Sequence, residues 1–136
     1  MPAYNFQARF ADAVEQGTKR STVRGREAVI GTTAHLFVGM RTKSCKRLGV
    51  HRIIDCKPIT LGFKQDGMPR IKLGNKVLSY SECEVLANSD GFDSPRELVR
   101  FFRDTYKLVL ATKDGGVDHF KGWLIAWNFE KEAAKP

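Results

Sequence analysis

The segment Gly17-Thr18-Lys19-Arg20-Ser21-Thr22-Val23-Arg24 marks the place where a helix gives way to a strand. Apolar residues recur at nearly helical spacing before it, and glycine is the residue type that often ends a helix. Side chains alternate between the two faces of an extended strand, so Thr22 and Arg24 should point to the same side. Lys19 precedes them in the turn, where its long side chain can fold back over that face. The segment therefore predicts a cation, a hydroxyl and an anion-binding guanidinium at one spot, which suits phosphate binding or carbonyl chemistry.

Short strands and a hairpin are predicted on both sides of this segment. Tyr4-Asn5-Phe6 favours a first strand, and a helix follows from Phe6 to the segment. Further along the chain, Gly39 should stop a strand, Pro58 should mark a bend or a sheet edge, and Gln65-Asp66-Gly67 should form the turn of a hairpin. The expected strands after the first are 21–24, 33–38, 50–56, 59–63, 70–73 and 120–129.

Two further helices are expected between the hairpin and the last strand. Ser81 and Glu84 have the spacing of a capping box, which would open a helix that runs to about Ser89. Ser94 is a second N-cap candidate, because proline follows at the first helical position and Glu97 follows at the third. This order of elements predicts an α+β fold, with a mainly antiparallel, curled sheet or small β-barrel flanked by three helices.

Length and charge indicate how many domains the chain has and what kind of partner it binds. The chain has 136 residues and 42% hydrophobic content, which favours a single domain over residues 1–130 and a frayed tail over residues 131–136. Its formal net charge is +8, and residues 1–76 hold 15 Lys and Arg but 5 Asp and Glu. This excess of positive charge favours a polyanionic partner, either nucleic acid or a nucleotide. The alternative is a basic surface that is simply well solvated. The most notable basic residues of the first half are Arg41, Lys43, Lys46, Arg47 and Arg52.

Cysteine, histidine and hydropathy patterns argue against several other classes. Cys45, Cys56 and Cys83 are odd in number and form no Cys-x-x-Cys pair, and the three histidines have no metal-ligand spacing. We therefore expect no disulfide framework, no metal and no cofactor. No apolar run is long enough for a transmembrane helix, and the N-terminus lacks the pattern of a signal peptide. A cytoplasmic protein is expected, without membrane contact and monomeric by default.

Four stretches of the sequence together resemble the ASCH domain, a family related to the PUA-like RNA-binding fold. They are the Gly-x-Lys-x-x-Thr-x-Arg segment, Gly39-Met40-Arg41-Thr42-Lys43, Asp90-Gly91-Phe92 before the helix with Phe101-Phe102, and residues 120–127. The first is the most specific, and the second also resembles ASCH proteins encoded by phages and prophages. The resemblance implies a β-barrel whose cleft is lined by Lys19, Thr22 and Arg24, with RNA or a nucleotide as ligand.

The resemblance also implies an alternative function as a small hydrolase. Some small bacterial ASCH members remove the acetyl group of N(4)-acetylcytidine with a lysine, a threonine and a glutamate, and other members are reported as ribonucleases. Lys19 and Thr22 match the first two positions, and Asp90, one methylene shorter than glutamate, is the best match for the third. In this role Lys19 would be the base, Thr22 the nucleophile and Asp90 the group that passes a proton to the leaving amine.

Three functions therefore stay open. The first is RNA or nucleotide binding, the second is the hydrolase built on Lys19, Thr22 and Asp90, and the third is a phage module that binds a host protein. Alternatively, Lys19 and Arg24 are surface cations, Thr22 is an ordinary strand residue and Asp90 caps a turn with Gly91. The residues expected to contact nucleic acid are Lys19, Arg20, Arg24, Arg41, Lys43, Lys46, Arg47 and Arg52.

Overall fold

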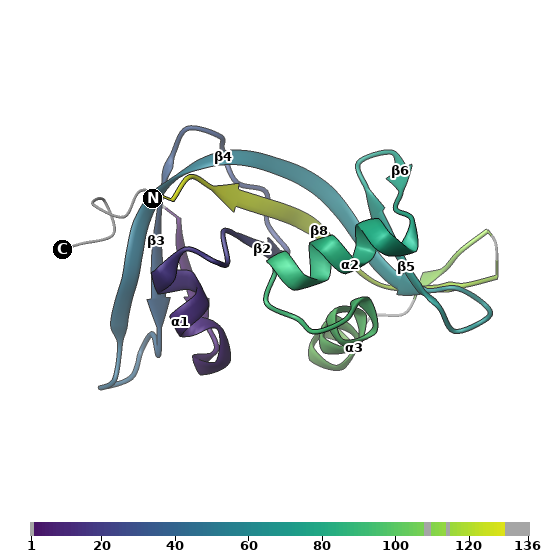
Figure 1. Cartoon of the computed structure of the whole chain (residues 1–136), viewed down its shortest axis with the longest axis horizontal. Helices are drawn as coiled ribbons and strands as arrows, with labels where there is room; N and C mark the ends of the chain where they lie inside the picture. The colour runs from purple at the N-terminus through teal and green to yellow at the C-terminus, as the bar shows by residue number, and fades with distance from the viewer. Residues whose placement is uncertain (1, 108–109, 114, 130–136) are drawn as a thin grey trace. The chain divides into compact units, whose positions relative to one another are not determined.

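The computed structural model describes residues 2–107, 110–113 and 115–129. These residues form three helices and eight strands, so the predicted α+β class is confirmed (Figure 1). Backbone contacts divide the chain into two compact units: unit 1 comprises Met1–Thr22, Glu27–Cys56 and Ile125–Pro136, and unit 2 comprises Val23–Arg26 and Lys57–Leu124. The predicted tail, residues 131–136, lies outside the described residues. A single domain over residues 1–130 stays a prediction.

Unit 1 contains a sheet in which β3 is the central strand. β1 (Ala3–Phe6) pairs in parallel with β3 (Thr33–Val38), and β3 pairs antiparallel with the first part of β4 (Lys46–Phe63). Side chains of β3 alternate: Ala34 and Leu36 are buried, whereas Thr33, His35 and Phe37 are half-buried. The side of the sheet that carries these two buried residues is called the inner face below, and the opposite side is called the outer face.

α1 (Ala8–Gln16) packs on the inner face beside β3 (Figure 1). It buries Phe10 and Val14, two of the residues whose spacing predicts the helix, and it ends at Gly17. Gly17 has a φ of 84°, and a Cβ atom there would lie 2.6 Å from the ring of Phe129, so both conformation and space require glycine. The buried apolar residues of unit 1 are Phe6, Phe10, Val14, Ala34, Leu36, Leu48, Ile53, Ile125 and Trp127.

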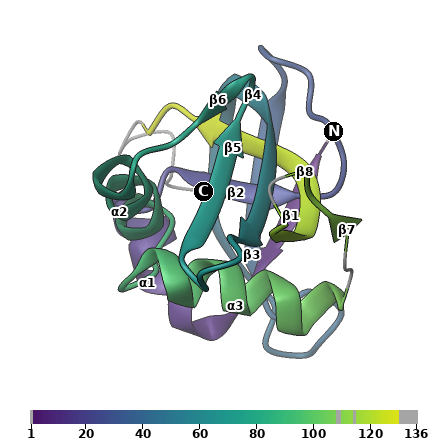
Figure 2. The same cartoon turned by 90° about the vertical axis from the view of Figure 1, so that its right-hand side faces the viewer.

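Unit 2 combines a hairpin with two helices. The second part of β4 pairs antiparallel with β5 (Pro69–Leu73) around the predicted turn, and β6 (Lys76–Val77) pairs with β5. α2 (Tyr80–Ser89) and α3 (Pro95–Tyr106) pack on each other, and both contact β5 (Figure 2). Within the described residues, neither these helices nor α1 has the length and apolar character of a membrane span.

The described strands belong to one mixed, mostly antiparallel sheet. Its path is β1-β3-β4-β5-β6, and β8 (Val117–Trp127) pairs with β4, with β2 (Ser21–Arg24) and with β7 (Leu110–Ala111). The predicted β-barrel is wrong, because the sheet does not close. Among the described residues β1 pairs only with β3 and β6 only with β5, whereas a barrel needs its first and last strands to pair. β8 also begins and ends earlier than the predicted strand 120–129.

Two further elements, β4 and α2, also differ from their predicted bounds. β4 is a single strand that continues through Pro58, where the sequence predicts two strands, 50–56 and 59–63. Proline's fixed φ allows extended backbone, and the Pro58 carbonyl still accepts a hydrogen bond from the Gly74 N–H at 2.8 Å. α2 begins two residues before the predicted capping box, because Ser79 is its N-cap. α3 begins at the predicted cap, Ser94, whose hydroxyl accepts a hydrogen bond from the N–H of Glu97.

Candidate nucleic-acid interface

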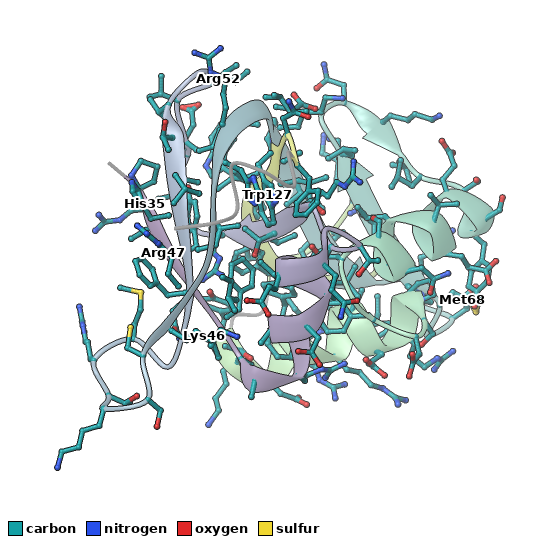
Figure 3. The ribbon with its side chains drawn as sticks, turned by 60° about the vertical axis from the view of Figure 1, so that its left-hand side comes forward. His35, Lys46, Arg47, Arg52, Met68 and Trp127 are labelled. Atoms are coloured by element: carbon teal, nitrogen blue, oxygen red, sulfur yellow. The ribbon has the colours of Figure 1, made fainter. Side chains whose placement is uncertain are left out.

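The outer face of unit 1 places aromatic and basic side chains in cross-strand register. The rows across β1, β3 and β4 are Asn5–Phe37–Arg47 and Ala3–His35–Val50, with Thr33 opposite Arg52 beyond them. These positions alternate with the buried residues of β3, so their side chains lie on the outer face. Arg47 and Arg52 are exposed, and His35 and Phe37 are half-buried. Figure 3 shows His35 and Arg47 on the same side of the hairpin, pointing away from α1.

A β-bulge at Leu48 brings Arg47 to the outer face. Leu36 pairs with Gly49, yet the next residue, Phe37, pairs with Arg47, so β4 has one extra residue at this point. Leu48 is buried and Arg47 is exposed. Without the extra residue, strict alternation along β4 would turn Leu48 outward and Arg47 inward. The bulge therefore sets Arg47 beside Phe37.

The turn between β3 and β4 is held in shape by its own hydrogen bonds. The Thr42 hydroxyl donates to the carbonyl of Gly39 at 2.6 Å and accepts from the N–H of Ser44 at 3.1 Å. Gly39 has a φ of 67°, and Arg41 has a φ of 64°, which few residues other than glycine adopt. Arg41 and Lys43 are exposed on this turn. Two cations predicted to bind nucleic acid are therefore carried by a defined turn.

The cations of this region have almost no acidic neighbours. We call residues 33–54, which contain no Asp or Glu, the basic hairpin. Lys46 is oriented towards α1 and pairs with Glu15 at 3.2 Å, although both side chains remain largely exposed. The other four cations make no ion pair among the described residues, so their charge is available to a polyanion. They are Arg41, Lys43, Arg47 and Arg52.

The Gly-x-Lys-x-x-Thr-x-Arg segment places its lysine and its threonine inside the protein. Lys19 is 3% exposed and Thr22 is 5% exposed, and both belong to unit 1. The Lys19 ammonium donates to the carbonyl of Ser21 at 2.8 Å and lies 5.2 Å from the ring centre of Phe10 and 5.8 Å from that of Phe6. Aromatic rings attract a cation and offset part of its lost hydration. Lys19 is therefore not a surface cation.

The other predicted site residues lie in different parts of the structure. They are Arg20, Arg24 and Asp90. Arg20 is exposed in unit 1, and its guanidinium lies 5.4 Å from the ring centre of Phe129. Arg24 is half-buried in β2 and belongs to unit 2. Asp90 also belongs to unit 2, where it is 2% exposed at the C-cap of α2. That Asp90 acts together with Lys19 and Thr22 stays a prediction.

Phe37 is a candidate contact residue that the sequence reasoning missed. The alternation within residues 33–38 is visible in the sequence, and it places Phe37 and His35 on one face. The sequence does not show which face of the strand is buried. It also does not show the register that sets Arg47 opposite Phe37, because both depend on pairing with β4.

The three cysteines are free thiols: Cys45 is exposed, Cys56 is half-buried and Cys83 is buried. Burial raises the pKa of the Cys83 thiol above its usual value. In the part of the chain that the structure describes, no group of three or more His, Cys, Asp or Glu side chains could hold a metal ion.

No family model, no curated protein and no solved structure matches this chain. The ASCH resemblance and the functions it implies stay predictions from sequence motifs.

Proposed function

We propose that this chain is an RNA-binding domain of the ASCH type that holds the phosphate backbone on the basic hairpin, residues 33–54. The proposal rests on one observation: four exposed cations of the hairpin have no acidic partner among the described residues. The net charge of +8 supports it, because a basic field attracts polyanions over several ångströms and speeds their encounter. The motif resemblance to ASCH proteins supports RNA as the polyanion.

The hairpin suits a phosphate backbone because its cations are held on a paired strand and on a hydrogen-bonded turn. Arg47 and Arg52 lie on the outer face of β4, and Arg41 and Lys43 lie on the hydrogen-bonded turn before it. A guanidinium can bind a phosphate through two parallel hydrogen bonds, and each neutralised phosphate releases counterions. Binding of this kind is expected to be sensitive to salt and to show little preference for sequence.

Fluorescence anisotropy with labelled RNA tests the proposal on matched variants. Arg47→Ala/Arg52→Ala removes two cations from the basic hairpin, and Arg96→Ala/Arg100→Ala removes two exposed arginines from α3 in unit 2. We expect the hairpin variant to lose affinity on the order of tenfold or more at about 50 mM salt, because each lost contact is a charged hydrogen bond. The α3 variant, with the same net charge, should bind nearly as the wild type does.

Two results would overturn the proposal. One is wild-type protein that fails to bind RNA at low salt. The other is an equal loss in the hairpin and α3 variants, which would mean that only overall charge matters. If DNA bound with the same affinity and the same dependence on Arg47, the basic hairpin would stand as the binding surface, but RNA would be rejected as its specific ligand.

A hydrolase is the second candidate, and the burial of Lys19 in unit 1 favours it, although the rings of Phe6 and Phe10 act in the opposite direction by stabilising the ammonium. A lysine removed from water can lose its proton more easily and then act as a base. Lys19 would take the proton of the Thr22 hydroxyl, whose oxygen attacks the acetyl carbonyl, and Asp90 would pass that proton from Lys19 to the nitrogen of the leaving amine as the C–N bond breaks. Water would then release acetate from Thr22. RNA binding ranks first because the basic hairpin is exposed, whereas Lys19 and Thr22 are nearly inaccessible.

Acetate release from N(4)-acetylcytidine, and RNA integrity on a gel, test this second candidate. Lys19→Met and Thr22→Val keep the size of each side chain and should abolish turnover, and Asp90→Asn should reduce it. Ser21→Ala, which removes a neighbouring hydroxyl, should leave turnover unchanged. Circular dichroism shows whether each variant is folded. A wild-type protein that releases no acetate and leaves RNA intact would exclude the hydrolase.

A further inference from the structure

The outer face of unit 1 has a feature that phosphate binding alone does not require. Phe37 lies in the middle of the row Asn5–Phe37–Arg47, so an aromatic residue and an arginine without an acidic partner among the described residues are cross-strand neighbours on one face. Among the described residues, the ring of Phe37 contacts no other aromatic ring and no cation. This sets it apart from Phe102 and Phe120, whose ring centres are 4.8 Å apart in unit 2. The Phe37 ring is therefore not part of an aromatic core cluster.

We infer that Phe37 is a stacking platform for an unpaired base and that the basic hairpin therefore selects single-stranded RNA. This inference rests on the proposed function, because the platform acts together with the phosphate contacts. A base can stack on the ring while its phosphate is held by Arg47, the cross-strand neighbour of Phe37. The Cβ atoms of such neighbours lie about 5 Å apart, which is within the reach of one nucleotide.

The arrangement of the face also suits a second base. His35 lies two residues from Phe37 on β3, which corresponds to about 6.6 Å along the strand, and its side chain is on the same face. Figure 3 shows His35 and Arg47 on one side of the hairpin, with Arg52 further along it. The His35 ring is half-buried and its Nε2 atom is buried, so a second base would reach only the exposed part of this ring while Arg47 and Arg52 hold the backbone. A duplex offers no such contact, because its base faces are covered by neighbouring bases.

Competition between three labelled RNA probes tests the inference on the full chain. The probes are a single strand about ten nucleotides long, an abasic strand with the same phosphates, and a duplex of that length. We expect the wild type to bind the single strand on the order of tenfold more tightly than the abasic strand and the duplex. Phe37→Leu should remove this preference, and Phe37→Tyr should keep it. Tyr80→Leu is the matched control, because Tyr80 is an aromatic residue that is 50% exposed on α2.

The outcomes separate this inference from the proposed function. Equal affinity of the wild type for the single and abasic strands would overturn the stacking platform, whatever the variants do. If that binding still depended on Arg47 and on salt, RNA binding through the hairpin would stand. An unchanged preference in folded Phe37→Leu would also overturn the platform. Failure of the wild type to bind any probe would reject both the platform and the proposed function.

Discussion

Gly39 controls the shape of the turn that carries Arg41 and Lys43. It has a φ of 67°, and a Cβ atom at this position would lie 3.2 Å from the carbonyl oxygen of Ser44. Both the backbone conformation and the nearby carbonyl oppose any side chain there. The position of two candidate RNA contacts therefore depends on one residue without a side chain.

Gly39→Ala should lower the free energy of unfolding by roughly 1–2 kcal/mol, because alanine is strained in the left-handed region. Gly25→Ala is the matched control, since a Cβ atom at Gly25 has no heavy atom within 4 Å and its φ is not left-handed. Its effect should stay within about 0.5 kcal/mol. Urea unfolding of both variants measures the difference. Equal stability of the two variants would contradict the role given to Gly39.

The start of α2 depends on a reciprocal cap at Ser79. The Ser79 hydroxyl accepts from the N–H of Glu82 at 3.3 Å, and the Glu82 carboxylate accepts from the N–H of Ser79 at 3.0 Å. Ser81 and Glu84 have the same sequence spacing but do not form the cap. Spacing alone therefore predicts a capping box near this point without deciding between two registers.

Ser79→Ala should destabilise the protein by about 1 kcal/mol, the usual cost of removing an N-cap hydroxyl. Ser81→Ala, at the position that the sequence favours, should cost less than about 0.5 kcal/mol because it does not cap the helix. Chemical unfolding of both variants under the same conditions gives the comparison. A larger loss in Ser81→Ala would restore the register expected from the sequence.

Glu82 makes the stability of α2 depend on pH. The side-chain hydrogen bond from Lys76, and then the backbone hydrogen bond from Ser79, lower the pKa of Glu82 from 4.5 to about 2. Because the pKa is lower in the folded state, folding is favoured while the carboxylate is charged. This contribution is fully present above pH 4.5 and is lost as the pH falls towards about 2.

The variant Glu82→Gln should therefore lose less stability than the wild type between pH 4.5 and about 2. Above pH 4.5 it should be the less stable of the two, because it lacks the ion pair with Lys76. Glu84→Gln, exposed on the same helix, is the control. Unfolding midpoints measured across this range give the comparison, and parallel pH profiles for Glu82→Gln and the wild type would contradict the expectation.

The number of phosphates that the molecule neutralises sets how strongly RNA binding should respond to salt. If the four unpaired cations of the basic hairpin each neutralise one phosphate, the plot of log affinity against log salt should have a slope of about −2.8 for a single strand. Affinity should then fall about fiftyfold between about 50 and 200 mM salt. Anisotropy titrations at several salt concentrations measure the slope. A slope near zero would show that phosphate contacts do not drive binding.

Much of the fold follows from local sequence signals. The glycines at 17 and 39 end α1 and β3, and the cap at Ser94 opens α3, because each of these signals acts within one or two turns of backbone. Predictions of the fold were wrong where the structure depends on contacts between segments far apart in the sequence. Pro58 does not interrupt β4, and the sheet does not close into a barrel. Closure depends on contacts between strands that no local pattern encodes.

The candidate site also has some features that the sequence predicts and others that only the folded chain shows. Residue type and spacing along the chain were sufficient to predict a strand at residues 33–38 that stops at Gly39 and a cluster of basic residues after it, because charge and alternation are properties of the chain itself. A polyanionic partner stays a prediction. Three features required the folded chain: the bulge at Leu48, the pairing of Phe37 with Arg47, and the burial of Lys19 against two aromatic rings. Each of them arises when residues far apart in sequence come into contact, and strand register and burial are determined only by those contacts.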